Sequence, residues 1–386
     1  MKKKALNVLM LVCNPFTNDP RVYNEARSLT QAGHKVTVIA FDKDKLNPQS
    51  ETRDGISIFR ISPKVPQRYY LGTPPWNGFS PLSWQRQAYS QALLLHKEHH
   101  FSIIHCHDFD TLLTGVRLKR QLSRPLIYDA HEIYGYMMAR HFPRRIANIF
   151  LWLEKNMIPN VDRIITVSEI VEKYFNRITN KSIAVIMNCK PLQNLEYERP
   201  DNRGIFCILY IGVLNEARSL SLLIDVVEKL DGVRCIIGGI GQPDYVRRLK
   251  ERCDKVPNID FIGEVPLAQV IPITKKADII FCMFDPTDPN SAIGLPNKQF
   301  EAMVCGRPII CTKGTYSGSF TEKEDVGLAV EYSRKALREA IVQLRDDSKL
   351  RETLGKNALK VATTKYNWQN QETKLLELYE NIDVVV

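Results

Sequence analysis

Residues 8–40 read VLMLVCNPFTNDPRVYNEARSLTQAGHKVTVIA. The runs 8–13 and 35–40 are apolar and rich in β-branched residues, which is typical of buried strands, whereas 21–32 has the amphipathic spacing of a helix. Gly33 stands where a helix C-cap is expected. The stretch therefore predicts a strand–helix–strand unit, the building block of a parallel sheet.

The same alternation continues along the chain and restarts once. Before the restart we expect strands at 56–61, 103–106, 126–129, 164–167 and 184–187, with helices at 83–99 and from 111. After it we expect strands at 207–212, 233–238, 259–263, 279–284, 308–312 and 327–330, and helices at 220–230, 245–254 and 368–382. The break between the two series, 191–203, is rich in proline and polar residues, as linkers are.

This organisation predicts an α/β protein with two doubly wound, Rossmann-like domains facing a cleft. The expected boundaries are an N-terminal domain over 1–192, a linker over 193–203, a C-terminal domain over 204–365 and a C-terminal helical segment over 366–386. Whether that last segment returns to the N-terminal domain is left open. A length of 386 residues suits two such domains.

The composition, 44% hydrophobic and 25% charged, is that of a folded globular protein. No apolar run approaches the roughly eighteen residues of a membrane-spanning helix. The basic start Met1-Lys2-Lys3-Lys4 leads into a short run that Asn14-Pro15 closes, which indicates a first strand and not an export signal. The nine cysteines are scattered and never form Cys-x-x-Cys, so we expect a cytoplasmic protein without structural zinc.

The net charge of +10 is unevenly distributed. Residues 1–190 contain 27 Lys and Arg against 15 Asp and Glu, a balance of +12, whereas the remainder contains 26 against 28, a balance of −2. Such a field suits an anionic membrane, a phosphate-bearing acceptor or nucleic acid, and it also suits an ordinary solvated surface. The basic and aromatic run 139–157 is compatible with a helix resting on an anionic membrane and with a core helix that has a basic cap.

The most informative segment is 291–308, which reads SAIGLPNKQFEAMVCGRP. It predicts a helix that begins near Pro296 and stops at Gly306-Arg307-Pro308. A helix N-terminus favours anions, and Lys298 and Glu301 are three residues apart on one helix face. The lysine can meet a diphosphate while the carboxylate accepts two ribose hydroxyls. An ordinary surface Lys–Glu pair is the alternative interpretation.

The motif Glu301-Ala302-Met303-x-x-Gly306-x-Pro308 resembles the donor-site helix of the retaining glycosyltransferases of family 4, which have the GT-B fold. The resemblance implies that Glu301 holds the ribose, that Lys298 meets the diphosphate, and that the donor also contacts Ile293, Gly294, Leu295 and Asn297. The family often has a second glutamate where this chain has Ile293. Donor hydroxyls must then be recognised by backbone amides around 293–295 or from elsewhere.

A second segment, 211–218, is similar to the first strand of that family's C-terminal domain and its basic pair. Gly212 belongs to the strand and Arg218 matches the family's lysine, but Val213 stands where the arginine is usual. Gly239, in the turn 238–241, receives a minor donor-side role. The turn is not a dinucleotide-binding fingerprint, because Asp244 occupies the third glycine position.

On the acceptor side, the sequence 128–132 (YDAHE) ends a strand, where open α/β sheets bind ligands. It resembles the family segment whose histidine lies beside the reacting sugar, which implicates His131 and Glu132. Asp19 and Arg21 begin a helix expected to face the cleft. His107 alternates with His105 on one strand face, yet no third ligand is suitably spaced, so we expect no metal.

These observations predict a metal-independent, cofactor-free, retaining glycosyltransferase with His131, Arg218, Lys298 and Glu301 as its catalytic set. The donor is a nucleoside diphosphate sugar, UDP-sugar ahead of GDP-mannose, carrying a hexose or N-acetylhexosamine. The acceptor is a glycan or lipid-linked molecule of polysaccharide or glycoconjugate biosynthesis, with contact to the inner face of the membrane left open and no nucleic acid partner. Alternatives are a non-hydrolysing UDP-N-acetylglucosamine 2-epimerase-like enzyme, a pyridoxal-dependent phosphorylase, and a basic nucleic-acid-binding or scaffold protein.

Overall fold

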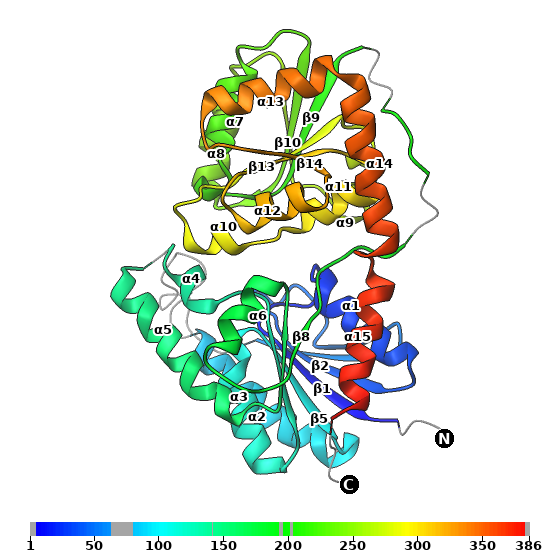
Figure 1. Ribbon diagram of the computed structural model, residues 1–386. Coiled ribbons are helices and arrows are strands. Elements are labelled where there is room, and N and C mark those ends of the chain that lie inside the picture. The colour runs from blue at the N-terminus through cyan, green and yellow to red at the C-terminus, as the bar shows by residue number, and fades with distance from the viewer. Residues whose placement is uncertain (1–4, 63–79, 141, 193–195, 201–203, 383–386) are drawn as a thin grey trace. The chain divides into compact units, whose positions relative to one another are not determined.

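The computed structural model describes residues 5–62, 80–140, 142–192, 196–200 and 204–382. The chain divides into two compact units: unit 1 comprises 1–187 and 372–386, and unit 2 comprises 188–371. Each unit is a twisted sheet covered by helices (Figure 1). Of the expected linker 193–203, only 196–200 is described, and His141 of the basic run also lies outside the described residues.

Unit 1 contains an eight-stranded sheet. Its strand order is β3 (Ser50–Arg53), β4 (Ile56–Ile61), β2 (Lys35–Phe41), β1 (Asn7–Val12), β5 (Ile103–His107), β6 (Leu126–Ala130), β7 (Arg163–Thr166) and β8 (Ile183–Val185). Every neighbouring pair is parallel except β3 and β4. The sequence did not predict β3, whose four residues include no apolar one. It joins β4 through Asp54-Gly55, both at positive φ, which is the geometry of a tight hairpin turn.

The helices of unit 1 are α1 (Pro20–Gln31), α2 (Ser80–His99), α3 (Phe109–Leu122), α4 (Tyr134–Met138), α5 (Arg144–Met157) and α6 (Glu169–Asn176). From β1 the chain first proceeds to β2 and β4 on one side, and then places β5 on the other. The carboxyl ends of β1 and β5 therefore flank the switch point at which doubly wound sheets bind ligands.

Unit 2 contains a six-stranded parallel sheet. Its order is β11 (Ile259–Gly263), β10 (Val233–Gly241), β9 (Phe206–Leu214), β12 (Ile279–Cys282), β13 (Ile309–Thr312) and β14 (Gly327–Val330). The helices are α7 (Leu220–Val227), α8 (Pro243–Cys253), α9 (Leu267–Thr274), α10 (Pro289–Ile293), α11 (Asn297–Val304), α12 (Tyr316–Lys323), α13 (Arg334–Asp346) and α14 (Ser348–Thr364). The switch point lies between β9 and β12, so the two doubly wound α/β units predicted from the sequence are confirmed.

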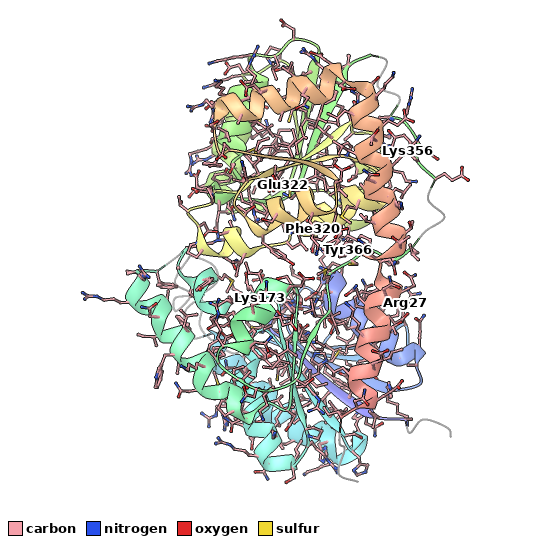
Figure 2. The ribbon with its side chains drawn as sticks, viewed as in Figure 1. Arg27, Lys173, Phe320, Glu322, Lys356 and Tyr366 are labelled. Carbon is pink, nitrogen blue, oxygen red and sulfur yellow. The ribbon has the colours of Figure 1, made fainter. Side chains whose placement is uncertain are left out.

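The core of unit 2 is formed by apolar side chains of its strands with those of α7, α8 and α13. A ring contact and a hydrogen bond hold the residues that follow α14. Figure 2 shows Phe320 of α12 beside Tyr366, with ring centroids 4.8 Å apart. The Tyr366 hydroxyl also donates to Glu324 at 2.9 Å. These contacts hold the turn that leads into the last helix.

That last helix, α15 (Trp368–Glu380), begins in unit 2 and ends in unit 1. In unit 2 the Trp368 amide donates to the Lys190 carbonyl at 2.9 Å. In unit 1 the Tyr379 hydroxyl lies 2.8 Å from His105 Nδ1. Within the described ranges, no helix combines the length and the apolarity needed to cross a bilayer.

Candidate active site

The switch point of unit 2 contains a buried lysine. Lys298 is the second residue of α11 and is 7% exposed. Its Nζ lies 3.4 Å from the centroid of the Tyr210 ring of β9, and in the described part of the chain this Nζ has no hydrogen-bond partner. Burial lowers the pKa of Lys298 to about 7. An ammonium group in such a place is destabilised until an anion pairs with it.

Two glycines shape the space next to this lysine. A Cβ at Gly212 would lie 3.2 Å from Lys298 Nζ, so a side chain at this position would crowd the ammonium group. A Cβ at Gly239 would lie 1.7 Å from the Gly212 carbonyl oxygen. Both glycines have positive φ, 155° and 138°. They allow β9 and β10 to stay paired to their ends beside the lysine.

Arg218 brings a second positive charge to the same place. It ends the short 3-10 helix η3 (Glu216–Arg218) after β9, and its guanidinium lies 4.6 Å from the centroid of the Phe284 ring. Lys298 Nζ lies 6.0 Å from the same centroid. Among the described residues, neither cation forms an ion pair, and Arg218 Nε is buried without a hydrogen-bond partner. Their mutual repulsion further lowers the pKa of Lys298, which burial already depresses.

The N-terminus of α11 adds to this positive field. Pro296 precedes the helix, and no side chain caps it. Ile293 ends α10, and Gly294 and Leu295 connect it to Pro296. Asn297 is exposed and its side-chain oxygen accepts from Asn188 at 2.7 Å. Since helix N-termini are partially positive, α11, Lys298 and Arg218 together suit an anionic group.

Glu301 lies one turn further along α11 but does not pair with Lys298. Its Oε1 lies 2.8 Å from Lys190 Nζ, and Glu301 is 8% exposed. The surface Lys–Glu pair considered from the sequence is therefore absent from this described helix, because each partner is buried and turned to a different neighbour. Sequence reasoning missed Lys190. Its described contacts are all with residues far away in the sequence: the ion pair with Glu301, the parallel bridge with Asn367 and the hydrogen bond from the Trp368 amide, which no local pattern indicates.

Unit 1 contains a separate, buried charge network built around Asp129 at the end of β6. Arg21 of α1 donates through Nε and Nη2 to the two carboxylate oxygens at 2.9 and 2.6 Å, and through Nη1 to the Ile186 carbonyl at 2.7 Å. Burial alone would raise the pKa of Asp129, but Arg21 and His131 lower it well below its usual range. Arg21 is 3% exposed, so its side chain lies in the interior of unit 1.

Two histidines complete the network. His107 Nδ1 lies 3.1 Å and His131 Nε2 lies 2.9 Å from Asp129 Oδ2. His131 Nδ1 is also 3.0 Å from Asp108 Oδ2, so this ring is held between two carboxylates. Burial lowers the pKa of His131, but Asp108 and Asp129 outweigh it and raise that pKa well above the usual value. This shift favours the protonated imidazole of His131, whose side chain is one-fifth exposed.

The remaining acceptor-side residues are placed less centrally. His107, already described as part of the network, is 1% exposed and therefore lies in the interior. Asp19 is the N-cap of α1, accepting from the Val22 amide at 3.1 Å and from Asn14 at 2.8 Å. Glu132 follows His131 and is half-buried. The structure thus brings Arg21, His107 and His131 together around Asp129, and leaves His131 as the member of that trio that reaches the surface.

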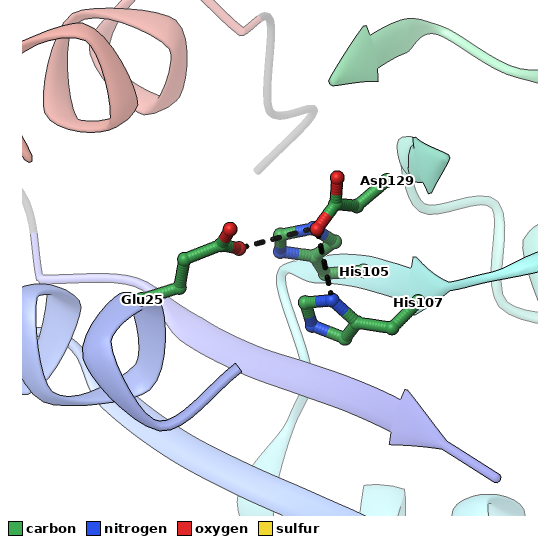
Figure 3. Close-up of side chains that lie close together, drawn as sticks. All are labelled: Glu25, His105, His107 and Asp129. Atoms are coloured by element: carbon green, nitrogen blue, oxygen red, sulfur yellow. Dashed lines mark hydrogen bonds and ion pairs between the residues drawn. The ribbon is translucent and has the colours of Figure 1, made fainter. Parts of the chain in front are cut away.

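The same network contains four groups of metal-ligand type, Glu25, His105, His107 and Asp129, whose nearest ligand atoms lie within 4.8 Å of one another (Figure 3). Sequence spacing missed Glu25, which α1 supplies. Arg21 Nη2 lies 2.6 Å from Asp129 and 3.3 Å from Glu25, so a guanidinium already sits beside both carboxylates. This cation would repel a divalent metal ion in the cluster.

A pocket of about 730 Å³ lies in unit 1 beside the carboxyl ends of β2 and β4. Its lining is dominated by amide, hydroxyl and charged side chains, including those of Asn47, Gln49, Ser62, Arg86 and Gln87. Side chains of these types hydrogen-bond sugar hydroxyls and phosphates.

Comparison with known proteins finds matches to both halves of the chain. Residues 21–192 match the family model described as Glycosyltransferase Family 4, and residues 206–347 match the model described as Glycosyl transferases group 1. One relative, an uncharacterized glycosyltransferase of Methanocaldococcus jannaschii, is 23% identical over 311 residues, which cover 80% of this chain and 84% of the relative.

Solved structures show the same fold at low sequence identity. Sucrose-phosphate synthase of Thermosynechococcus elongatus superimposes with a TM-score of 0.80 at 17% identity, covering 97% of this chain and 98% of its own. The Anabaena protein HepE, in complex with UDP and glucose, gives a TM-score of 0.75 at 17% identity, covering 98% of this chain and all of its own. At this level of sequence identity, both similarities show a shared fold and nothing further.

Proposed function

Since this chain belongs to the glycosyltransferases of family 4 and group 1, with the GT-B fold, we propose that it transfers a sugar from a UDP-sugar to a glycan or lipid-linked acceptor with retention of configuration. The observation that carries the donor part is the pair of cations without carboxylate partners, Lys298 and Arg218, among the described residues of the β9/β12 switch point. A diphosphate supplies the negative charges that this place lacks.

The base of the donor is proposed from the comparison. HepE, which has the same fold, was solved with UDP and with UDP-glucose, so uridine ranks ahead of guanosine for this chain. Glu301 has one carboxylate oxygen on Lys190 and a second oxygen for the ribose hydroxyls. GDP-mannose is the next candidate. UDP and GDP contain the same ribose, so the contacts of Glu301 do not distinguish the two nucleotides.

The proposed reaction breaks the bond between the anomeric carbon and the β-phosphate oxygen. The bond between that carbon and the acceptor oxygen forms on the same face, and the acceptor proton moves to a phosphate oxygen of the leaving UDP. Negative charge grows on the diphosphate as its bond to the sugar breaks. Lys298 and Arg218 stabilise that charge without a metal ion, because both are held in place before the reaction begins.

The acceptor side of the proposal rests on unit 1. His131 presents its imidazole at the surface of unit 1, and the pocket beside β2 and β4 offers polar side chains suited to carbohydrate hydroxyls. A glycan, or the glycan portion of a lipid-linked molecule, presents such hydroxyls. This chemistry fits polysaccharide or glycoconjugate biosynthesis.

Thermal melting with a panel of UDP-, GDP- and ADP-sugars tests the donor assignment. A ligand at 100 times its dissociation constant stabilises the folded state by about 2.7 kcal/mol, so the true donor raises the melting temperature. Lys298→Ala and Arg218→Ala should abolish the increase, whereas Arg248→Ala, an exposed arginine of α8, should keep it. If no nucleotide sugar stabilised the parent protein, the donor site would be wrongly placed.

Kinetics then separate two roles. Lys298 meets the charge of the bound diphosphate and also the charge that grows in the transition state, so Lys298→Ala should both weaken donor binding and lower kcat by about a hundredfold or more. Glu301 meets hydroxyls that do not change during the reaction, so Glu301→Ala should mainly raise the donor KM. Product anomers identified by nuclear magnetic resonance test retention, and an inverted product would refute the same-face mechanism.

A further inference from the structure

Helix α5 exposes three large apolar side chains on its outer surface. Ile146 is 38% exposed, Ile149 is 53% exposed and Trp152 is 62% exposed. Because they are three residues apart, they lie on successive turns and form one oblique stripe across the solvent side of the helix. A contiguous apolar patch on the surface of a folded protein marks a place of interaction more often than isolated exposed residues do. We call these three residues the α5 stripe.

The fold of unit 1 does not need the α5 stripe. The opposite side of the helix supplies the buried residues Ala147 and Glu154, and Figure 1 places α5 at the outer edge of its unit. Phe150 packs its ring 5.6 Å from that of Tyr134. Glu154 accepts from the Tyr128 hydroxyl at 2.6 Å. These contacts anchor the helix and leave the stripe outside.

The charges around the stripe have one sign. Arg144, Arg145 and Lys155 are exposed on the same helix. Its only acidic residue is Glu154, which is buried, and burial raises the pKa of that carboxyl to about 8. The solvent side of α5 therefore has three cations, no carboxylate and three apolar side chains, on the half of the sequence that also has the excess of basic residues.

We propose that α5 docks unit 1 onto an anionic lipid bilayer, with the α5 stripe inserted between the headgroups and Arg144, Arg145 and Lys155 against the lipid phosphates. A helix with this pattern lies in the plane of the interface and buries its apolar face about 5–10 Å deep. The proposal goes beyond the transfer reaction and does not depend on the donor assignment.

A protein partner fits these features less well. Two copies meeting through α5 would bring the same three cations of each copy together, which is electrostatically unfavourable. A specific protein interface also covers about 800 Å² on each side, whereas the stripe consists of three side chains on one helix. Anionic lipid headgroups complement the charge and require only a narrow apolar stripe.

Vesicle flotation of the full chain tests the proposal. We expect binding to vesicles of phosphatidylcholine mixed with phosphatidylglycerol, weak binding to phosphatidylcholine alone, and loss of binding at high salt, since exposed charges are screened. Trp152→Glu and the double variant Ile146→Ser with Ile149→Ser should each reduce flotation at least about tenfold, because apolar burial drives insertion. The matched control is Ile240→Ser, which changes an isoleucine that is 57% exposed in unit 2 and should bind like the parent.

Tryptophan fluorescence supplies a second readout. Trp84 and Trp368 are 0% and 6% exposed, and the fourth tryptophan, Trp76, lies outside the described residues and is replaced by phenylalanine for this experiment. In this Trp76→Phe background, quenching by brominated lipids should depend on Trp152 and vanish when Trp152→Phe is added. Melting temperatures of all variants, with and without UDP-glucose, confirm that they are folded and separate this proposal from the donor assignment. Parent-like flotation of Trp152→Glu would overturn the proposal. So would a concentration-dependent dimer in solution that Trp152→Glu abolishes, because the stripe would then be a protein interface.

Discussion

The lowered pKa of Lys298 leads us to expect that donor binding depends on pH, in a range where the donor itself does not titrate. Burial first, and then the nearby Arg218, lower the pKa of this lysine to about 7, although Cys282 and Glu301 act in the opposite direction. A bound diphosphate requires the charged form. The binding-competent fraction is then about three quarters at pH 6.5 and about one thirtieth at pH 8.5, so the apparent affinity should fall by about 25-fold, or about 1.9 kcal/mol.

Raising the pH should weaken donor binding but increase the contribution of Lys298 to the stability of the folded protein. Without ligand, the unfolded chain holds the Lys298 proton up to its ordinary pKa of 10.5, whereas the folded chain releases it near 7. The unfolded state therefore binds more protons between these two values, and the contribution of Lys298 to the free energy of unfolding rises with pH in that window. Donor binding weakens over the same window, so a general loss of structure cannot imitate it.

Isothermal titration calorimetry with UDP-glucose at about pH 6.5, 7.5 and 8.5 measures the effect. A diphosphate between two ester groups has no ionisation near pH 6, unlike a terminal phosphate. Buffers of different ionisation enthalpy should show that binding takes up nearly one proton at the upper pH. Lys298→Arg remains charged and should lose the pH dependence. If the parent affinity stayed within twofold across this range while UDP-glucose bound well, the reasoning about Lys298 would be refuted.

Three further outcomes are expected. Lys190→Met removes the ion pair that holds Glu301, so it should raise the donor KM with little change in kcat, and steady-state kinetics would contradict this role by showing unchanged KM. Gly239→Ala would force a Cβ to within 1.7 Å of the Gly212 carbonyl oxygen, so it should lower the free energy of unfolding by about 2 kcal/mol or more, measured by denaturant unfolding. Gly263→Ala is the control, because a Cβ there would meet nothing within 4 Å, and it should lower that free energy by only about 1 kcal/mol through backbone strain. Turnover should survive a chelator, and activity restored by added manganese or magnesium would contradict a metal-independent reaction.

Local sequence patterns were sufficient to predict most strands of the two sheets and the helix α11. The spacing that predicted a helix from Pro296 is realised as α11, because proline before the first turn and Gly306-Arg307-Pro308 after the last are local signals. The edge strand β3 was missed because its residues are polar, although the Asp54-Gly55 turn was a usable signal. Strand edges depend on pairing with a neighbour more than on composition.

The contacts of the site residues could not be predicted in the same way. The spacing of Lys298 and Glu301 correctly put them on one helix, but their burial and their different neighbours follow from tertiary packing. Lys190 and Glu25 carried no signal, since each acts on a residue far away in the sequence. The pairing of Arg21 with Asp129 could not be predicted either, because an arginine in the first turn of a helix is ordinarily solvated and the two residues are far apart in the sequence.

The two units differ in how the charge of an arginine is compensated, and this difference explains why the two arginines have different roles. Each unit places an arginine near the carboxyl edge of a doubly wound sheet. In unit 1, Arg21 is paired inside the protein with Asp129, whose carboxylate also contacts His131, so the charge of Arg21 is already compensated. In unit 2, Arg218 and Lys298 share aromatic neighbours and have no carboxylate on either cation in the described chain. Holding two uncompensated cations together is unfavourable in the ligand-free protein, and a diphosphate would supply the missing negative charge, which is why we propose that the donor binds to unit 2.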